Sequence, residues 1–327
     1  MGSFSQNDGQ DHRPNLLLLM TDQQRADAMG CSGGWVQTPH LDRIAAEGIH
    51  YTNCVTTTPV CVPARLSLAT GLYCHNTGVW NNCNHTMAAE TPTWMQAIRN
   101  AGYRTSLFGK THWHPHTGDL RDRAHLLHAY GFDDIDEVTG PRASAWCRSR
   151  MTDVWEAAGK WQAYQDDYAH RFANYPQVVR PSPLGAELYY DTYVGDRAAE
   201  YLAHYNHNKP WFCWVSFPGP HEPWDTPEPY AGMYDVDAMP PPAAVPRSQT
   251  HRPRGALDHM IAYPPVVLKA DEPGRLRADY AANITLIDDQ IGRILDTLVS
   301  RGELDNTAII FTSDHGEMNG DCGLIYK

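Results

Sequence analysis

The chain has 327 residues, of which 42% are hydrophobic and 20% are charged, a balance typical of a globular protein and not of a disordered one. The formal net charge of −12 argues against nucleic acid as a partner, because neutralising phosphates requires an excess of Lys and Arg. No apolar run approaches the roughly 20 residues of a membrane-spanning helix, so we expect no membrane partner either.

The N-terminus, residues 1–13, is polar and mixed in charge, with no apolar stretch of the secretory type. We therefore expect a flexible N-terminus and a cytoplasmic protein. The eight cysteines include no Cys-x-x-Cys pair, which argues against a zinc ribbon or a thioredoxin-type site. In a cytoplasmic protein most of them are expected to be free thiols.

In the first third of the chain, apolar runs alternate with helical patterns. The runs 16–20 and 103–108 have the length of strands that are buried on both faces. Between them, 38–48 and 93–101 have helical patterns, which Gly48 and Gly102 bring to an end.

Two long intervals of the remaining chain look irregular. Residues 115–200 carry few strand signals, and residues 218–274 are rich in proline. We predict both intervals to be excursions over the rim of the sheet that shape access for a substrate. Further strands are predicted at 211–217 and 308–311, and apolar residues at three- and four-residue steps predict a helix from about 275 to 299.

Strands that alternate with helices predict an α/β fold, with a mostly parallel central sheet flanked by helices. In such a sheet the ligand site lies beyond the carboxyl ends of the strands. Polar residues follow each of the four predicted strands: Asp22 and Gln23, then Lys110 and His112, then His221, and last Asp314 and His315. The sequence therefore predicts an active site at that edge of the sheet.

One pentapeptide, Cys-x-Pro-x-Arg from Cys61 to Arg65, has the chemistry of a functional motif. Proline fits the first turn of a helix, so a helix that begins near Pro63 would hold Arg65 close to Cys61. The residues alone leave two alternatives open: Cys61 also fits a buried cysteine in a turn, and Arg65 fits a surface arginine, since short motifs recur by chance.

A divalent metal fits the acidic strand ends. Carboxylate oxygens suit calcium, magnesium or manganese, and a neutral imidazole shifts the preference from calcium towards manganese. Taken singly, Asp22 also fits a helix N-cap and His315 a loop histidine. Two strands far apart in sequence that both end in Asp favour the metal site.

Together and in this order, the motifs resemble those of the formylglycine-dependent sulfatases of the alkaline phosphatase-like superfamily. The resemblance runs from Asn15 to the last residue and implies a single catalytic domain over 1–327. The motifs are Asp22-Gln23, Cys61 to Arg65, Gly109-Lys110-x-His112, Pro220-His221-x-Pro223-Trp224 and Ser313-Asp314-His315-Gly316.

The resemblance implies that a formylglycine-generating enzyme oxidises Cys61 to formylglycine (3-oxoalanine), whose hydrated form is the nucleophile. It also implies one divalent metal ion, most usually calcium, with manganese or magnesium as alternatives. The implied ligands are Asp22, Gln23, Asp314, His315 and one oxygen of the modified Cys61. Gln23 replaces the second Asp of many sulfatases, and the Asp-Gln and Asp-His pairs are more similar to those of choline sulfatases and phosphonate monoester hydrolases.

The implied reaction is hydrolysis of a sulfate monoester to an alcohol and inorganic sulfate. One hydroxyl of the diol attacks sulfur in line, and loss of a proton from the second hydroxyl then expels sulfate. The implied roles are Arg65 stabilising the diol, Lys110 binding a sulfate oxygen, His112 taking the second proton, and His221 acting as acid or sulfate ligand. Lys110 and His112, two apart on an extended segment, are expected to face the same side.

Two further residues are candidates for the sulfate. Asn82 is a weaker candidate for a contact, and Lys327 stands in a Gly-Leu-x-Tyr-Lys context that in choline sulfatase-like relatives binds sulfate and assists its departure. Relatives continue beyond this lysine, so we expect a chain that is truncated at its C-terminus, with the usual C-terminal subdomain missing.

Other functions stay open at this point. A phosphonate monoester hydrolase or phosphodiesterase would use the same diol, although Lys110 and His112 favour the sulfatase. A non-catalytic binding protein on the same fold is a second alternative, and a thiolate hydrolase at Cys61 leaves the Asp residues unexplained. The alcohol of the substrate is open among aryl, sugar and choline-like groups, the last through cation–π contacts, and a homo-oligomer is expected as an option.

Overall fold

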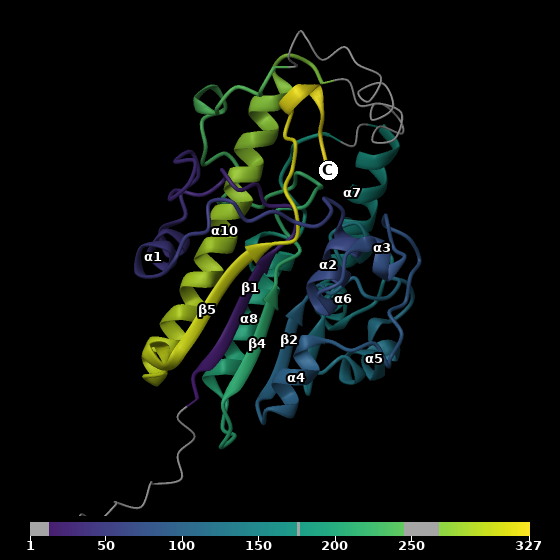
Figure 1. The fold of residues 1–327 in the computed structure, drawn as a ribbon. Helices are drawn as coiled ribbons and strands as arrows, with labels where there is room; N and C mark the ends of the chain where they lie inside the picture. Colours follow the sequence, from purple (N-terminus) through teal and green to yellow (C-terminus); the bar gives the residue numbers. More distant parts are fainter. Residues whose placement is uncertain (1–12, 175–176, 245–267) are drawn as a thin grey trace, which may run out of the picture.

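The computed structural model describes residues 13–174, 177–244 and 268–327, and in these residues five parallel strands form one sheet (Figure 1). The strand order is β3-β2-β4-β1-β5. Their bounds are β1 Asn15–Thr21, β2 Arg104–Gly109, β3 Asp134–Glu137, β4 Trp211–Ser216 and β5 Thr307–Ser313. The predicted α/β fold with a parallel central sheet is confirmed, and so are its four predicted strands.

Strand β1 shows why a continuous apolar run forms a central strand. It pairs with β4 on one side and β5 on the other, with Leu18 opposite both Trp214 and Ile310. Its alternate side chains enter different cores: Leu17 and Leu19 pack in one cluster, and Leu18 packs in the other. Both faces of the sheet are therefore covered, and a strand in that position needs apolar residues without alternation.

The longest helix, α10 (Glu272–Arg301), corresponds to the predicted helix at 275–299. It packs with α8 (Tyr190–Ala203) in the core on one face of the sheet. On the other face, α2 (Cys61–Thr70) and α4 (Trp94–Asn100) contribute to the second core. The remaining α-helices with printed bounds are α1 Pro39–Glu47, α3 Cys74–Thr77, α5 Ala124–Ala129, α6 Arg150–Ala157 and α7 Trp161–Asn174.

The fifth strand, β3, was not predicted, because its sequence Asp-Ile-Asp-Glu is acidic. It pairs with β2 at the edge of the sheet. Polar contacts hold it there: Arg104 of β2 forms an ion pair with Asp134 at 2.6 Å, and Tyr201 donates to Asp134 at 2.8 Å. An edge strand that is fixed by charges leaves no apolar run to recognise.

The prediction that residues 115–200 are one excursion over the rim is wrong for two of their elements. Strand β3 belongs to the sheet, and α8 covers one of its faces. The buried face of α8 includes Tyr190, Val194, Ala198 and Leu202, which are four residues apart, a signal that the surrounding charged and aromatic residues obscured. Of the proline-rich interval 218–274, residues 245–267 lie outside the described residues, as do residues 1–12 of the expected flexible N-terminus.

None of the described helices is both long enough and apolar enough to cross a membrane.

Candidate active site

The polar residues that follow the strands meet at the carboxyl end of the sheet, as the sequence predicted. Asp22 follows β1, Lys110 follows β2, and Asp314 and His315 follow β5. The backbone links these ends directly, because Asp22 N donates to Gly219 O beyond β4 and Lys110 N donates to Ser216 O, both at 3.0 Å.

Cys61 is the first residue of α2, two residues earlier than the predicted start near Pro63. Pro63 nevertheless lies in the first turn, where its missing N–H is not needed. The Asn82 side chain accepts a 2.9 Å hydrogen bond from Val62 N, which satisfies one of the free N–H groups at this helix end. Cys61 is 1% exposed, so the helix places its sulfur inside the site at the positive end of the helix dipole.

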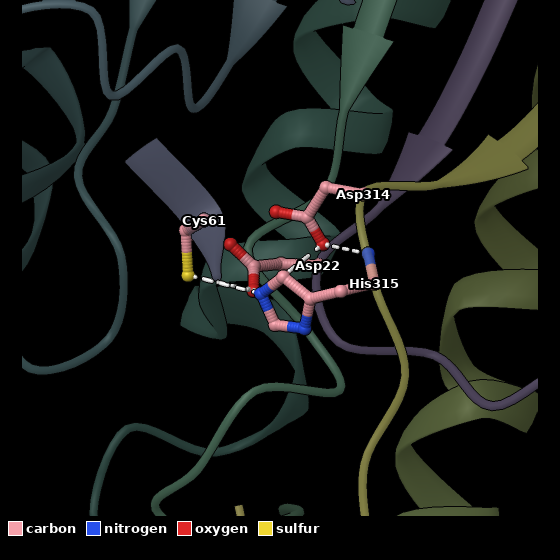
Figure 2. Close-up of side chains that lie close together, drawn as sticks. All are labelled: Asp22, Cys61, Asp314 and His315. Atoms are coloured by element: carbon pink, nitrogen blue, oxygen red, sulfur yellow. Dashed lines mark hydrogen bonds and ion pairs between the residues drawn. The ribbon is translucent and has the colours of Figure 1, made fainter. Parts of the chain in front are cut away.

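Four buried side chains, Asp22, Cys61, Asp314 and His315, form a compact cluster whose ligand atoms all lie within 4.8 Å of one another (Figure 2). Nε2 of His315 lies 3.1 Å from the Cys61 sulfur, 3.7 Å from Oδ1 of Asp22 and 3.6 Å from Oδ1 of Asp314. The Cys61 sulfur lies 3.7 Å from Oδ1 of Asp22. Segments from the two ends of the chain thus meet the N-terminus of α2 at one point.

Arg65 fixes the orientation of the two carboxylates. Its guanidinium donates to Oδ2 of Asp22 at 3.1 Å and to Oδ2 of Asp314 at 2.7 Å, and all three side chains are fully buried. It also donates to Lys110 O and Ser216 Oγ, so it is not a surface arginine. With Oδ2 engaged, each carboxylate has its Oδ1 atom towards His315.

Charges in the cluster shift the protonation of its members. Burial and the Cys61 sulfur raise the pKa of Asp22, but Lys110 and Arg65 outweigh them and hold it well below its usual range. Burial raises the pKa of the Cys61 thiol, whereas Lys327, Lys110 and His315 lower it far more, to well below its usual value. The basic side chains around the cluster therefore stabilise the negatively charged forms of Asp22 and Cys61.

The donor set fits a divalent cation. Two carboxylate Oδ1 atoms and one imidazole nitrogen face a common point, and hard or borderline cations prefer such ligands. The sulfur of Cys61 completes the cluster at the position where a modified residue would offer oxygen. Burial lowers the pKa of His315, but Asp314 and the Cys61 sulfur raise it to about 9, so the carboxylates of the cluster attract positive charge at this nitrogen.

Gly109 determines where Lys110 and His112 lie. Its φ is 112°, and a Cβ atom there would lie 1.9 Å from Ser216 O, so only glycine fits. Lys110 forms an ion pair with Asp22, and His112 lies beside Cys61. Both predicted residues enter the site, but not by the alternation of an extended strand, because His112 has a left-handed φ of 61°. Burial lowers the pKa of His112.

Lys327, Gln23 and His221 form a second group beside the cluster. Lys327 Nζ donates to Gln23 Oε1 at 2.6 Å and lies 2.8 Å from Nε2 of His221. The Gln23 side-chain amide also donates to Glu222 at 2.9 Å, so each end of this amide has a partner outside the four-residue cluster. A role for Gln23 as a metal ligand stays a prediction.

Sequence reasoning missed three charged residues around this second group. Glu222 lies 3.2 Å from Nδ1 of His221 and forms an ion pair with Arg142, while Glu317 accepts from the Gln23 amide. Burial raises the pKa of Glu222, but Arg142 and His221 lower it to about 2. Burial and Glu222 raise the pKa of Glu317 to about 7. Glu222 directly follows His221, which was the available signal, whereas nothing local marks Arg142.

Comparison with known proteins identifies the family to which the chain belongs. A family model described as Sulfatase matches residues 14–326. The chain is 29% identical to an arylsulfatase of Clostridium perfringens, over 94% of this chain and 64% of that protein. It is 31% identical to PehA of Trinickia caryophylli, a multifunctional alkaline phosphatase superfamily protein, over 96% of this chain and 65% of that one.

A solved structure with the same fold is the phosphonate monoester hydrolase of Agrobacterium radiobacter, with a TM-score of 0.71 and 27% identity. The match covers 96% of this chain and 65% of that chain. The present chain therefore spans less than two thirds of the length of these relatives.

Proposed function

Since the chain belongs to the sulfatase family, we propose that it hydrolyses a sulfate monoester to an alcohol and inorganic sulfate. The observation that carries this proposal is the surroundings of Cys61. Its sulfur lies 3.1 Å from Nε2 of His315 and 3.7 Å from Oδ1 of Asp22, and His112 is a further neighbour. A structural cysteine needs none of these partners.

In the mature protein, position 61 carries formylglycine. A formylglycine-generating enzyme uses a two-electron oxidant to convert the CH₂–SH group of Cys61 to an aldehyde, the sulfur leaves as hydrogen sulfide, and water adds to give a diol. The sulfur atom in the structure stands in for one hydroxyl oxygen of that diol.

One divalent cation completes the site. Asp22, Asp314 and His315 would hold it with an oxygen at position 61, and Gln23 is the further candidate ligand. Calcium is the first expectation, with manganese or magnesium as alternatives. When bound, such an ion lowers the pKa of a hydroxyl group and offsets negative charge on the sulfate.

The first step transfers sulfate to position 61. Lys110 and Lys327 bind sulfate oxygens, with Asn82 as a weaker contact, and orient the ester. One hydroxyl loses its proton to solvent and attacks sulfur in line, the bond between sulfur and the alcohol oxygen breaks, and protonated His221 gives that oxygen a proton. Nε2 of His221 and Nζ of Lys327 lie 2.8 Å apart, which supports a shared role at the departing oxygen.

The second step releases inorganic sulfate. His112, beside position 61, takes the proton of the second hydroxyl. The carbonyl re-forms as the bond between carbon and the sulfate oxygen breaks, and water restores the diol. Arg65 acts through Asp22 and Asp314 by holding both carboxylates in place.

A phosphonate monoester hydrolase is the second candidate, because a protein of that description shares the fold with a TM-score of 0.71. Rates on 4-nitrophenyl sulfate and on a 4-nitrophenyl phosphonate monoester separate the two. We expect the sulfate ester to be the better substrate, and a much faster reaction of the phosphonate ester would reverse the order. A non-catalytic binding protein would hydrolyse neither ester.

The direct test combines mass spectrometry with activity. The protein is produced with and without a formylglycine-generating enzyme, and the mass of the peptide that contains Cys61 is measured. We expect hydrolysis of 4-nitrophenyl sulfate in proportion to the aldehyde fraction, and none in Cys61→Ala. Cys31→Ser, at an exposed cysteine, is the matched control and should keep full activity. Full activity with an unmodified thiol would contradict the mechanism.

The remaining predictions on cell biology are proposals too. We propose a cytoplasmic protein, which cell fractionation tests, and a homo-oligomer, which sedimentation velocity tests. Secretion of the intact protein or a monomer at micromolar concentration would contradict them.

A further inference from the structure

Arg142, on the segment after β3, presents a positive charge beside the second group of the site. Its side chain is 40% exposed, whereas its ion-pair partner Glu222 is 2% exposed. Part of the Arg142 side chain is therefore open to solvent, whereas the carboxylate that pairs with it is buried. Glu222 offsets the charge without covering it.

Two aromatic rings hold the guanidinium in position. Its carbon lies 4.7 Å from the ring centroid of Phe172 and 5.4 Å from that of Tyr326. Tyr326 in turn stacks on Trp224, with centroids 5.6 Å apart. A guanidinium that is fixed between rings loses little freedom when it binds a further group, because its orientation is already set.

Some N–H groups of Arg142 have no hydrogen-bond partner in the described part of the chain. Nη2 donates to Glu222, while Nε is buried and Nη1 makes no hydrogen bond with any residue in the described part of the chain. A planar guanidinium with free N–H groups matches a carboxylate or a sulfate, which it binds through two parallel hydrogen bonds.

Short contacts connect Arg142 to the predicted sulfate ligands. Glu222 lies 3.2 Å from Nδ1 of His221, and the opposite nitrogen of that imidazole lies 2.8 Å from Lys327 Nζ. The Arg142 guanidinium therefore borders the residues that would hold the sulfate, on the Nδ1 side of the His221 ring, where an alcohol part that extends past this ring would meet it.

We propose that Arg142 is a specificity-determining residue that binds an oxyanion, a carboxylate or a second sulfate, on the alcohol part of the substrate. This rests on the proposed function and names its substrate class: sulfate esters of anionic alcohols. The positive charge disfavours a choline-like cation at the same place, because like charges repel.

The experiment compares two matched pairs of esters in the mature, metal-loaded protein and in Arg142→Gln. The first pair is 4-carboxyphenyl sulfate and phenyl sulfate. The second pair is choline sulfate and 3,3-dimethylbutyl sulfate, in which the alcohol part has the same shape but no charge. In the variant, kcat/KM for the carboxylated ester should fall at least about tenfold more than for phenyl sulfate, mainly through KM. For the second pair, the substitution should raise kcat/KM for choline sulfate relative to kcat/KM for its analogue.

Arg148→Gln is the matched control. Arg148 is 44% exposed, forms an ion pair with Glu156 at 2.7 Å and lies 4.7 Å from the Trp161 ring centroid, so it resembles Arg142 in exposure and in having a carboxylate and an aromatic neighbour. It should leave both substrate ratios unchanged. Arg142→Lys keeps a charge beside Glu222 and should retain part of the preference, which shows that lost folding is not the cause.

The proposal is supported if Arg142→Gln lowers the kcat/KM ratio of 4-carboxyphenyl sulfate to phenyl sulfate and raises that of choline sulfate to its analogue. A merely structural role would lower all four rates alike. Equal losses, or unchanged ratios, overturn it. Should the wild-type protein hydrolyse none of the four esters, the proposed function fails first. Calorimetric binding of 4-carboxyphenyl sulfate and phenyl sulfate then still tests Arg142, and an equal affinity for both would reject its role.

Discussion

Nε of Arg65 donates a 2.7 Å hydrogen bond to Oδ2 of Asp314, and neither side chain is exposed. Because the same guanidinium also holds Asp22, its loss would leave two buried carboxylates without their common partner. We expect Arg65→Gln to lower the free energy of unfolding by about 3–5 kcal/mol. Urea unfolding in the presence of a chelator measures this change.

The control for Arg65 is Arg43→Gln, at an exposed arginine of α1 whose partner is Glu47. That change should leave the free energy of unfolding nearly unchanged, because exposed ion pairs contribute little. A similar small cost at Arg65 would show that the buried pairs do not hold the cluster together.

Asp314 presents one oxygen to the four-residue cluster, and we expect Asp314→Asn to weaken metal binding. The wild-type protein should retain about one divalent ion per chain after dialysis, and the variant far less, because a negative ligand is lost. Inductively coupled plasma mass spectrometry measures the content directly. Asp305→Asn, at an exposed aspartate, is the control, and equal metal content in both variants would exclude Asp314 as a ligand.

Gly109 is the residue whose substitution should most disturb the approach to Lys110. In Gly109→Ala the new Cβ would meet Ser216 O at 1.9 Å, so the backbone must shift. Gly302 also has a positive φ, of 65°, but nothing lies within 4 Å of a Cβ there, so Gly302→Ala should cost only about 1–2 kcal/mol. Thermal unfolding and sulfatase rates of both variants test this. Equal destabilisation would mean that the contact with β4 does not matter.

Asp279 of α10 should make stability depend on pH. Burial and Asp225 raise the pKa of Asp279 to about 8. Between about pH 4 and 8 the folded protein keeps a proton that the unfolded chain has lost, so the free energy of unfolding falls as the pH rises, by up to about 1.4 kcal/mol per unit. Asp279→Asn should flatten this fall.

Asp279 accepts a 3.2 Å hydrogen bond from Thr226 N, and the oxygen of an asparagine can accept the same bond. The control is Asp296→Asn, at an exposed aspartate of the same helix, which should keep the wild-type pH dependence. Urea unfolding at pH 5, 6.5 and 8 compares the three proteins, and parallel curves for wild type and Asp279→Asn would reject the prediction.

Local sequence patterns were enough to predict the elements whose own residues show a regular apolar pattern. The uninterrupted apolar run of β1 and the apolar stripe of α10 reflect burial along one short segment, so each could be recognised without its neighbours. Strand β3 could not, because Arg104 and Tyr201, distant in sequence, hold its acidic residues in the sheet.

By itself, the sequence determined the parallel α/β architecture and the residues at the strand ends, since periodicity and the order of motifs are local properties. Only the tertiary structure decided how these residues are held. Arg65 joins two carboxylates from opposite ends of the chain, and Arg142 pairs with Glu222 between Phe172 and Tyr326. Such contacts depend on how distant segments pack, and no pattern within either segment encodes them.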